Sequence, residues 1–492
     1  MTQETPTGAR RHTPLQLFNM ILFSVCAIML LSQFTMTAQI GPTSIFWTIV
    51  IIVLFFIPYG LITSELGSTY PDAGGIYSWV VRAFGTKWGT RVSWWYWVNV
   101  ALWVPSVYFI FAGTLSQLFF GGNLNFWVQI AIALVLIWVN YWINSRRLET
   151  GAWVSNLGAG ITMAVTAVLV VVAIVFGIHN GSATQFTIHT MLPTGSDTFP
   201  AIAMALPIII YNFLGFELMS SASLQMRNPK KDVPRAIITA AVLIGLFYLL
   251  ATISMQVIQG ADDIDTTTGL IGSLQVALGS STAANVFIGI LSVGALYCFF
   301  ACLIPWTIGA NMAAAEASQR GDLPAFFGRS HPRFGTPTGA ALLTSIVGTI
   351  VTIIFAILSS ATNGSINDVF WNLFWFSSVI FLLPYIVLML VFLRLRKIDA
   401  NARRPYRVPG GDGLIKAMAW IPLILLALSV VFFIVNPFDF DWTATVPILI
   451  GCVIVVVIEE VLVKRSRNWV AVKSLETVAD TETAEVLEDA KK

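Results

Sequence analysis

The chain has 492 residues, of which 57% are hydrophobic and only 11% are charged, and its mean hydropathy is +0.79. Soluble domains carry about 25% charged residues, and a single soluble core stops growing beyond about 250–300 residues. This composition excludes an ordinary soluble protein, and we expect lipid to solvate most of the surface. The net charge of +2 gives no reason to expect a nucleic-acid partner.

Twelve segments contain the run of roughly 20 mostly apolar residues that a lipid-spanning helix needs. In chain order they are 15–38, 43–66, 90–120, 125–145, 152–178, 199–225, 234–258, 284–317, 337–360, 367–393, 417–436 and 443–463. The first is too long and too polar at its flanks for a cleaved signal peptide. The amphipathic stretch GGIYSWVVRAFG, between the second and third segments, is expected to lie along the membrane interface.

Charge predicts the orientation of these segments. All 27 Lys and Arg residues fall on one side, in the tails, in alternate connections or, for Arg91 and Arg235, at the adjoining segment ends. That side is cytoplasmic if the N-terminus is cytoplasmic. The opposite connections carry only acidic charges, at Asp197, Asp262, Asp263, Asp265, Asp368, Asp439 and Asp441. By the positive-inside rule, the protein is a multi-pass protein of the inner or plasma membrane with both termini in the cytoplasm. A wrong helix count would destroy this alternation, so the two inferences support each other.

Four regions follow from this topology. We expect a cytoplasmic tail at 1–14, a core of ten helices at 15–396, two further helices with their preceding loop at 397–464, and an acidic cytoplasmic tail at 465–492. The last part of that tail, 474–492, lacks aromatic residues and is predicted to be disordered or loosely helical.

Polar residues inside the sixth segment are the strongest indication of a functional site. This segment contains Pro207, Asn212, Gly215 and Glu217. A charged side chain at mid-membrane costs about 2.5–3.5 kcal/mol on the insertion scale, so such residues are usually functional. Glu217 is predicted to face a central cavity and to bind protons, because low-dielectric surroundings disfavour its charged form. The alternative is a carboxylate that snorkels to the interface or caps a helix.

Two other helices carry weaker signals. The first segment has small residues at Cys26 and Ala27 and a polar cluster, Ser32-Gln33-Phe34-Thr35, which could equally serve helix packing. The third segment has Asn99 within the aromatic run WWYWVNVALW. Most of the aromatic residues of this run are expected to form an interfacial belt; they are Trp94, Trp95, Tyr96, Trp97 and Trp103. The first and sixth segments lie five helices apart, which fits transporters built from two inverted five-helix repeats whose first helices are both broken at the substrate site.

Several function classes lack their sequence signatures. There is no HExxH motif, no pair of Asp-rich motifs, no nucleophile elbow and no phosphate-binding Gly-Lys-Ser/Thr loop. The four cysteines lie in apolar segments without zinc-ligand spacing, so we expect no metal and no other cofactor. An enzyme and an ATP-driven pump are therefore disfavoured. A sensor is disfavoured too, because no sizeable cytoplasmic domain could relay a signal.

Four motifs give the chain a specific resemblance. In order they are FFIPYGLITSELGSTYPDAGGIYSWVVRAFG, YNFLGFELMSSASLQMRNPKKDVPRAI, AAAEASQRGDLPAFFGRSHPRFGTPTG and RPYRVPGGDG. Over roughly residues 12–465 the chain resembles the amino acid–polyamine–organocation permease superfamily, most closely its glutamate–GABA antiporter branch. The resemblance implies an all-α polytopic membrane protein with twelve helices, namely a five-plus-five inverted-repeat core followed by two C-terminal helices.

The resemblance also implies a function and a set of site residues. The function is secondary active transport of amino acids or amines by alternating access, as an antiporter or a proton-coupled permease. Tyr211 matches the aromatic gate of helix six, Trp306 matches the tryptophan that packs over substrate, and Asn99 matches the asparagine of helix three. Glu217 matches the helix-six acid and is the candidate proton-coupling residue. Asn212 and Gly215 complete the helix-six part of the predicted substrate site.

One departure from the family leaves the substrate open. The usual Gly-Ser-Gly of helix one, whose open backbone receives the substrate carboxylate, aligns with Cys26-Ala27-Ile28, which we include among the predicted substrate-binding residues. Apart from Arg91 and Arg235, each the second residue at the cytoplasmic end of its segment, no membrane segment carries Lys or Arg. The absence of a deeper cation weakens the case for strict glutamate selectivity. A polyamine or other organic-cation permease therefore stays an alternative. The predicted partners are a small amino acid or amine, protons and the lipid bilayer, and the oligomeric state is open.

Overall fold

The computed structural model describes residues 17–72, 74–193, 198–221, 228–265, 268–361, 366–435, 445–446 and 448–465. All regular secondary structure in these ranges is helical, which confirms the all-α fold class. Both predicted tails lie outside the described residues, apart from residue 465, as do Asp197, Asp439 and Asp441.

Eighteen α-helices are numbered along the described part of the chain. In chain order they are α1 (Leu17–Ile28), α2 (Leu31–Gln39), α3 (Thr43–Ile51), α4 (Ile57–Thr69), α5 (Ile76–Phe84), α6 (Thr86–Phe120), α7 (Phe126–Asn144), α8 (Leu148–Asn180), α9 (Ile188–Met191), α10 (Thr198–Asn212), α11 (Leu218–Ser221), α12 (Pro229–Ile258), α13 (Gly269–Leu278), α14 (Thr282–Ala301), α15 (Leu303–Gln319), α16 (Thr338–Ala361), α17 (Ile366–Ile398) and α18 (Asp412–Ile434). A π-helical turn, η1 (Ile52–Phe56), joins α3 to α4, and a last helix occupies 448–465.

Within the described ranges, nine helices are long and apolar enough to cross a membrane, and the bent pair α1–α2 would make a tenth. The predicted sixth span corresponds to the short helix α10, the break that follows it and α11. The predicted twelfth span begins among residues that the structure does not describe. A polytopic membrane fold is therefore established, and the count of twelve stays a prediction.

Two breaks interrupt the first and sixth predicted spans, which are the two that the repeat hypothesis requires to be broken. The axes of α1 and α2 differ by 46°, and Leu30 between them is extended, with φ −94° and ψ 133°. The second break separates α10 from α11 and contains Gly215 at φ +130°, a conformation that essentially only glycine adopts. A Cβ there would also lie 3.0 Å from both Ile28 and Trp306, so sterics and backbone both require glycine.

Helix α6 is the central element of the bundle. It packs against α5, α7, α14, α15, α16 and α17. Trp97 and Trp103 on this helix are each only 3% exposed, so the prediction that they belong to an interfacial belt is wrong. Both faces of α6 are covered by other helices, and the indole Nε1 of Trp97 donates to Thr344 Oγ1 at 2.9 Å.

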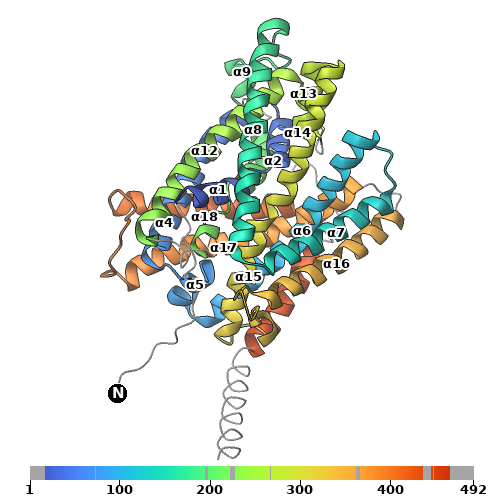
Figure 1. Cartoon of the computed structure of the whole chain (residues 1–492). Coiled ribbons are helices and arrows are strands. Elements are labelled where there is room, and N and C mark those ends of the chain that lie inside the picture. Colours follow the sequence, from blue (N-terminus) through green and yellow to red (C-terminus); the bar gives the residue numbers. More distant parts are fainter. Residues whose placement is uncertain are drawn as a thin grey trace, which may run out of the picture.

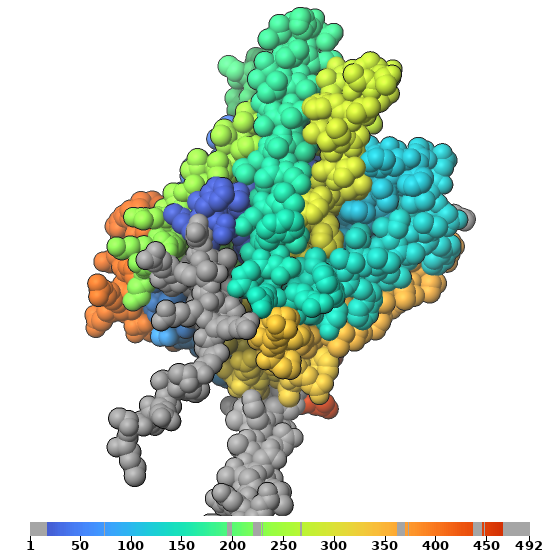
Figure 2. Space-filling model, in the orientation of Figure 1, coloured from blue at the N-terminus to red at the C-terminus, as the bar shows by residue number. Residues whose placement is uncertain are grey.

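The connections predicted to face opposite sides of the membrane lie at opposite ends of the molecule. Helices α9 and α13 stand at one end, and α5 lies near the other (Figure 1). The space-filling view shows α8 and α13 projecting beyond the loop that joins α6 to α7 (Figure 2). This arrangement fits the predicted alternation of the connections.

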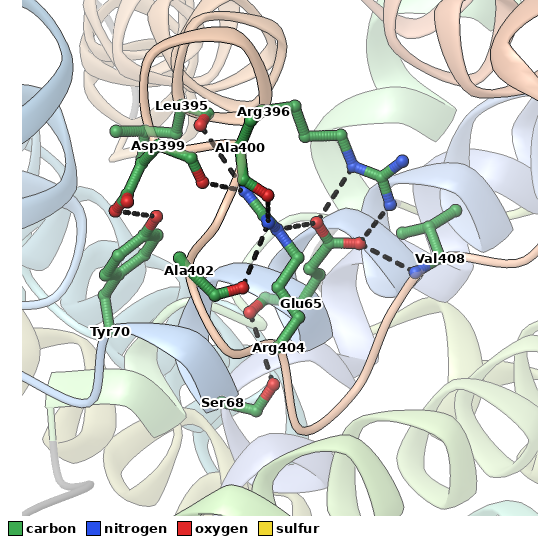
Figure 3. A network of polar contacts seen from close by, with 10 residues as sticks. All are labelled: Glu65, Ser68, Tyr70, Leu395, Arg396, Asp399, Ala400, Ala402, Arg404 and Val408. Atoms are coloured by element: carbon green, nitrogen blue, oxygen red, sulfur yellow. Dashed lines mark hydrogen bonds and ion pairs between the residues drawn. The ribbon is translucent and has the colours of Figure 1, made fainter.

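A buried ion-pair network ties the end of α4 to the end of α17 (Figure 3). Glu65 is 2% exposed, and its carboxylate accepts from Arg396 through both oxygens. Arg404 Nε lies 3.1 Å from Glu65 Oε1, and the Val408 backbone N–H donates to Oε2 at 2.7 Å. Two guanidinium groups and one amide thus compensate a carboxylate that would otherwise be costly to bury.

The same network caps the carboxyl end of α17 (Figure 3). Arg404 donates to the carbonyl oxygens of Asp399 at 2.8 Å and Leu395 at 3.4 Å, where a cation also complements the helix dipole. The Tyr70 hydroxyl donates to Asp399 Oδ2 at 2.8 Å. Burial raises the pKa of Tyr70 to about 12, so the hydroxyl keeps its proton at neutral pH.

Candidate functional site

A small cavity lies where the two helix breaks meet. Its wall consists of Ala27, Ile28, Leu30, Gln33, Asn99, Trp103, Tyr211, Asn212, Leu214, Trp306 and Phe381. These residues come from α1, α2, α6, α10, α15, α17 and the two breaks. The cavity volume is about 20 Å³, which is enough for roughly one water molecule. Any larger ligand therefore requires wall residues to move.

Aromatic side chains form one part of the wall. The Trp306 ring lies edge-on to Trp103, with centroids 5.6 Å apart, and to Phe381 at 5.2 Å. Tyr211 meets Phe381 in the same manner at 5.0 Å. The Trp306 Nε1 donates to the Ala27 carbonyl oxygen at 2.8 Å, at the end of α1. This aromatic group can cover a cation, because ring faces attract positive charge.

Neutral amide side chains form the polar part of the wall. Gln33, Asn99 and Asn212 are only 3%, 1% and 3% exposed. In the part of the chain that the structure describes, Gln33 Oε1, Asn99 Oδ1 and Asn212 Oδ1 have no hydrogen-bond partner. A buried acceptor without a donor costs about 1–3 kcal/mol. A ligand with N–H donors would remove this cost, and none of the described wall residues carries a charge.

Some of the backbone groups at the first break already have hydrogen-bond partners within the protein. The Ala27 carbonyl accepts from Trp306, and the Ile28 carbonyl accepts from the Tyr248 hydroxyl at 3.0 Å. The Leu30 side chain does not cap the start of α2, but the N–H groups of Gln33 and Phe34 both donate to the Leu30 carbonyl, at 3.1 and 3.3 Å. The remaining first-turn N–H groups and the dipole of α2 are what an anionic group would meet here.

Comparison with known families agrees with this architecture. A family model described as amino acid permease matches residues 15–458, which is nearly the whole chain. The chain belongs to the amino acid permease family.

Three relatives of the permease are transporters of amino acids or amines. A probable agmatine/putrescine antiporter of Lactococcus lactis is 35% identical over 453 residues, covering 91% of this chain and 94% of the relative. The glutamate/gamma-aminobutyrate antiporter of the same species is 24% identical, covering 77% and 76%. The cadaverine/lysine antiporter of Escherichia coli is 26% identical, covering 71% and 75%.

The structure brings together six of the eight residues predicted to bind substrate in the permease. Those in the cavity wall are Ala27, Ile28, Asn99, Tyr211, Asn212 and Trp306. Cys26 is not in the wall, because its Sγ faces α8, where a Cβ on Gly158 would lie 3.2 Å away. Gly215 is not in the wall either. Its lack of a side chain leaves room for Ile28 and Trp306. Substrate binding by the six wall residues stays a prediction.

Glu217 lies outside the cavity wall, at the second break, among three tyrosine hydroxyls. Tyr96 donates to its Oε1 at 2.6 Å and Tyr385 donates to the same oxygen at 2.7 Å. Tyr59 donates to Oε2. The Glu217 side chain is 2% exposed and takes part in none of the ion pairs among the described residues, so it does not snorkel to the interface. It does not line the cavity either, so the prediction that it faces the central cavity is wrong. The three tyrosines come from α4, α6 and α17, so Glu217 joins those helices to the break.

The Tyr59 hydroxyl fixes the direction of one of these hydrogen bonds. Its oxygen accepts from the backbone N–H groups of Gly215 and Phe216, at 3.1 and 3.0 Å. With two donors already at its oxygen, Tyr59 must direct its own proton to Glu217. The arrangement of three O–H donors around two oxygens suits the carboxylate form. Oε1 accepts two hydrogen bonds and Oε2 accepts one, so the free lone-pair position for a proton on Glu217 is on Oε2, beside the bond from Tyr59.

Sequence reasoning missed five wall residues and the three tyrosines around Glu217. The five wall residues are Leu30, Gln33, Trp103, Leu214 and Phe381. A signal existed for one of them, because Trp103 lies four residues after Asn99 and thus on the same face of a helix. Gln33 stands out in the sequence only as part of a polar cluster. Nothing in the sequence distinguishes Phe381 from its apolar neighbours.

Proposed function

We propose that this permease is a secondary antiporter that exchanges cationic amines or amino acids across the cell membrane by alternating access. The observation that carries this proposal is the small cavity between two broken helices, whose described wall residues supply aromatic rings and amide side chains with unpaired oxygens but no charged side chain. An ammonium group supplies the donors that these oxygens lack and the positive charge that the rings attract. The antiporter names of the relatives support the same class of substrate.

Substrate entry requires Trp306 or its neighbours to move, since the cavity holds about 20 Å³. Trp306 is held by one hydrogen bond to the Ala27 carbonyl and by ring contacts with Trp103 and Phe381, which its movement would break. Tyr211 lies on the opposite broken helix and packs on the same Phe381 ring. In this mechanism the two aromatic residues close over the substrate after binding, and the breaks let half-helices move relative to the rest of the bundle.

Glu217 is proposed to link protonation to this movement. Its hydrogen bonds reach α4, α6 and α17, and its backbone lies in the break between α10 and α11. Protonation would remove the negative charge and so weaken the hydrogen bonds that Glu217 accepts from Tyr59, Tyr96 and Tyr385, which would loosen the contact between the break and α4, α6 and α17. The remaining alternative is that Glu217 only braces these helices and keeps its charge throughout the cycle.

The partition of basic residues supports the proposed topology, with both termini in the cytoplasm. In that orientation the Glu65 network lies on the cytoplasmic side of the cavity, where α4 and α17 end.

Counterflow in proteoliposomes tests the proposed function. Purified protein is reconstituted with an unlabelled diamine or amino acid inside, and uptake of labelled putrescine, agmatine, lysine and glutamate is measured. We expect uptake of the cationic compounds that depends on the internal substrate. Uptake that is driven by a proton gradient and needs no internal substrate would show that the protein is a symporter and not an exchanger. No uptake of any of the four, in protein with a cooperative unfolding transition, would refute the proposal.

A further inference from the structure

We infer that the outer face of α7 binds an anionic phospholipid, whose acyl chain lies in an apolar hollow and whose phosphate group meets a cluster of arginines at the end of the helix. The hollow has a volume of about 410 Å³ and is lined by Leu134, Val135, Trp138, Val139 and Trp142. Trp138 and Trp142 are 42% and 54% exposed, whereas other faces of α7 pack against α6 and α16. In a membrane, lipid chains are what this apolar face meets.

The arginines lie directly at the end of this hollow. The guanidinium carbon of Arg146 is 4.7 Å from the centroid of the Trp142 ring, and Trp142 is itself part of the hollow. Arg147 follows in the chain and lies over the Phe334 ring at 5.7 Å, and Arg333 lies over the same ring at 5.6 Å. Contacts of this kind hold a guanidinium group in place while its N–H donors stay available. One end of the hollow therefore carries a fixed group of cations.

The loop that carries Arg333 is attached to the end of α7. The Thr336 hydroxyl donates to the Ser145 carbonyl oxygen at 3.4 Å. His331 stacks on Phe334, with ring centroids 4.5 Å apart, and its Nδ1 accepts from the Arg333 backbone N–H at 3.1 Å. A neutral imidazole with an acceptor at Nδ1 carries its hydrogen on Nε2, which is a further donor for a phosphate oxygen.

The positive charge of this cluster is not offset by acidic side chains in the described part of the chain. Arg146, Arg147 and Arg333 are exposed, and none of them takes part in an ion pair there. Glu149, the acid nearest to the first two in the chain, is half-buried in the first turn of α8 and forms no ion pair with them. Guanidinium groups bind phosphate through paired hydrogen bonds. A lipid with a net negative charge gains from all three arginines, whereas the choline group of phosphatidylcholine is a cation that they repel.

A second copy of the chain is a less favourable occupant of this face than a lipid. Two copies in one membrane share their orientation, so a two-fold interface through α7 would bring the same residues of both copies together at the same depth. The three arginines of one copy would then approach the three arginines of the other, and like charges repel. An anionic lipid meets the same cluster with the opposite charge.

Native mass spectrometry of the full chain in detergent tests this inference. The protein is titrated with phosphatidylglycerol or with phosphatidylcholine of the same acyl chains, and the dissociation constant of the most tightly bound lipid is compared. We expect the wild-type protein to bind phosphatidylglycerol more tightly. One arginine near an anionic lipid changes affinity by roughly fivefold. The double variant Arg146→Gln/Arg147→Gln should therefore weaken phosphatidylglycerol binding by about 25-fold and leave phosphatidylcholine binding unchanged.

The matched control is Arg403→Gln/Arg407→Gln, which makes the same change of net charge. Both arginines are exposed and lie outside the ion pairs of the described residues, but they are not part of the α7 cluster. This variant should keep the wild-type affinity for phosphatidylglycerol. If the Arg146/Arg147 variant does not fold, Trp138→Ala provides a second test, because it removes apolar surface from the hollow and should weaken lipid binding several-fold without a change of charge.

Four results would overturn the inference. They are equal affinity of the wild-type protein for the two lipids, equal losses in the two arginine double variants, displacement of the lipid by glycerol phosphate at the same concentration, and a dimer that forms through this face and excludes lipid. An unchanged affinity in a folded Trp138→Ala protein would remove the hollow from the site and would overturn it as well. The inference does not depend on the proposed substrate, so none of these results bears on the exchange activity.

Discussion

Replacing Glu217 by glutamine separates a proton-coupling role from a bracing role. The change keeps the size of the side chain and removes its ability to ionise. In the native site the carboxylate accepts three hydrogen bonds, from Tyr59, Tyr96 and Tyr385. A glutamine oxygen placed at Oε1 can still accept from Tyr96 and Tyr385. Its Nε2 then faces the Tyr59 hydroxyl hydrogen, which cannot turn away because the Tyr59 oxygen already accepts from two backbone N–H groups.

The loss of stability expected for Glu217→Gln follows from this one contact between two hydrogen-bond donors. A buried donor that faces another donor costs about 1–3 kcal/mol. Two of the three hydrogen bonds survive, so Glu217→Gln should fold with a lower melting temperature and should still bind substrate. Because the amide cannot take up or release a proton, the exchange rate should lose most of its dependence on pH over about pH 5–8, the range in which a coupling group has to titrate.

The assay is substrate exchange in proteoliposomes at a series of pH values, with thermal unfolding measured in parallel. Tyr385→Phe is the control, because it removes one hydrogen bond at Oε1 and leaves a carboxyl group that can still ionise. That variant should keep a pH dependence. A Glu217→Gln protein that transports with the wild-type pH profile would refute the proton-coupling role. A folded Glu217→Gln protein that is inactive at every pH would show that the carboxylate is a brace.

Three further predictions concern the aromatic gate, the ion-pair network and the topology. Trp306→Ala should lower substrate affinity several-fold in counterflow, since ring and cation–π contacts contribute about 0.5–2 kcal/mol, and wild-type kinetics in a folded variant would remove Trp306 from the site. Glu65→Gln should lower the melting temperature in detergent, because it leaves two guanidinium groups without their carboxylate. Breaking a buried pair in this way costs up to about 3–5 kcal/mol. An unchanged melting temperature would contradict the role given to this network. Reporter fusions after Gly122 should locate outside the cell and fusions after Arg147 inside, and a reversed reading at either position would break the twelve-helix topology there.

The fold class was accessible from sequence because it depends on local patterns, whereas the two breaks were expected only by analogy with inverted-repeat transporters. Long apolar segments must be helical in lipid, since every backbone polar group has to be satisfied within the segment. The sixth segment stood out through Asn212, Gly215 and Glu217, residues that an uninterrupted lipid-facing helix does not favour. The partition of all 27 basic residues predicted a topology without any contact information.

The composition of the site depended on directions that a linear sequence does not contain. Successive residues on an α-helix point about 100° apart, so the prediction could name Cys26 and Ala27 together but could not tell which faces the cavity. The structure turns Cys26 towards α8 and leaves Ala27 in the wall. The roles of two neighbouring residues in the chain can therefore be assigned only when the helices that pack against each of them are known.

The amino-acid order was sufficient to establish an all-helical membrane protein with unusual first and sixth segments, and with Glu217 in an apolar segment that contains no basic residue. It could not show that Glu217 is surrounded by hydroxyls. Its partners Tyr59, Tyr96 and Tyr385 lie 158, 121 and 168 residues away, on three helices whose side-by-side packing no local pattern encodes. The same holds for the cavity, because its wall exists only where α1, α2, α6, α10, α15 and α17 converge with the two breaks.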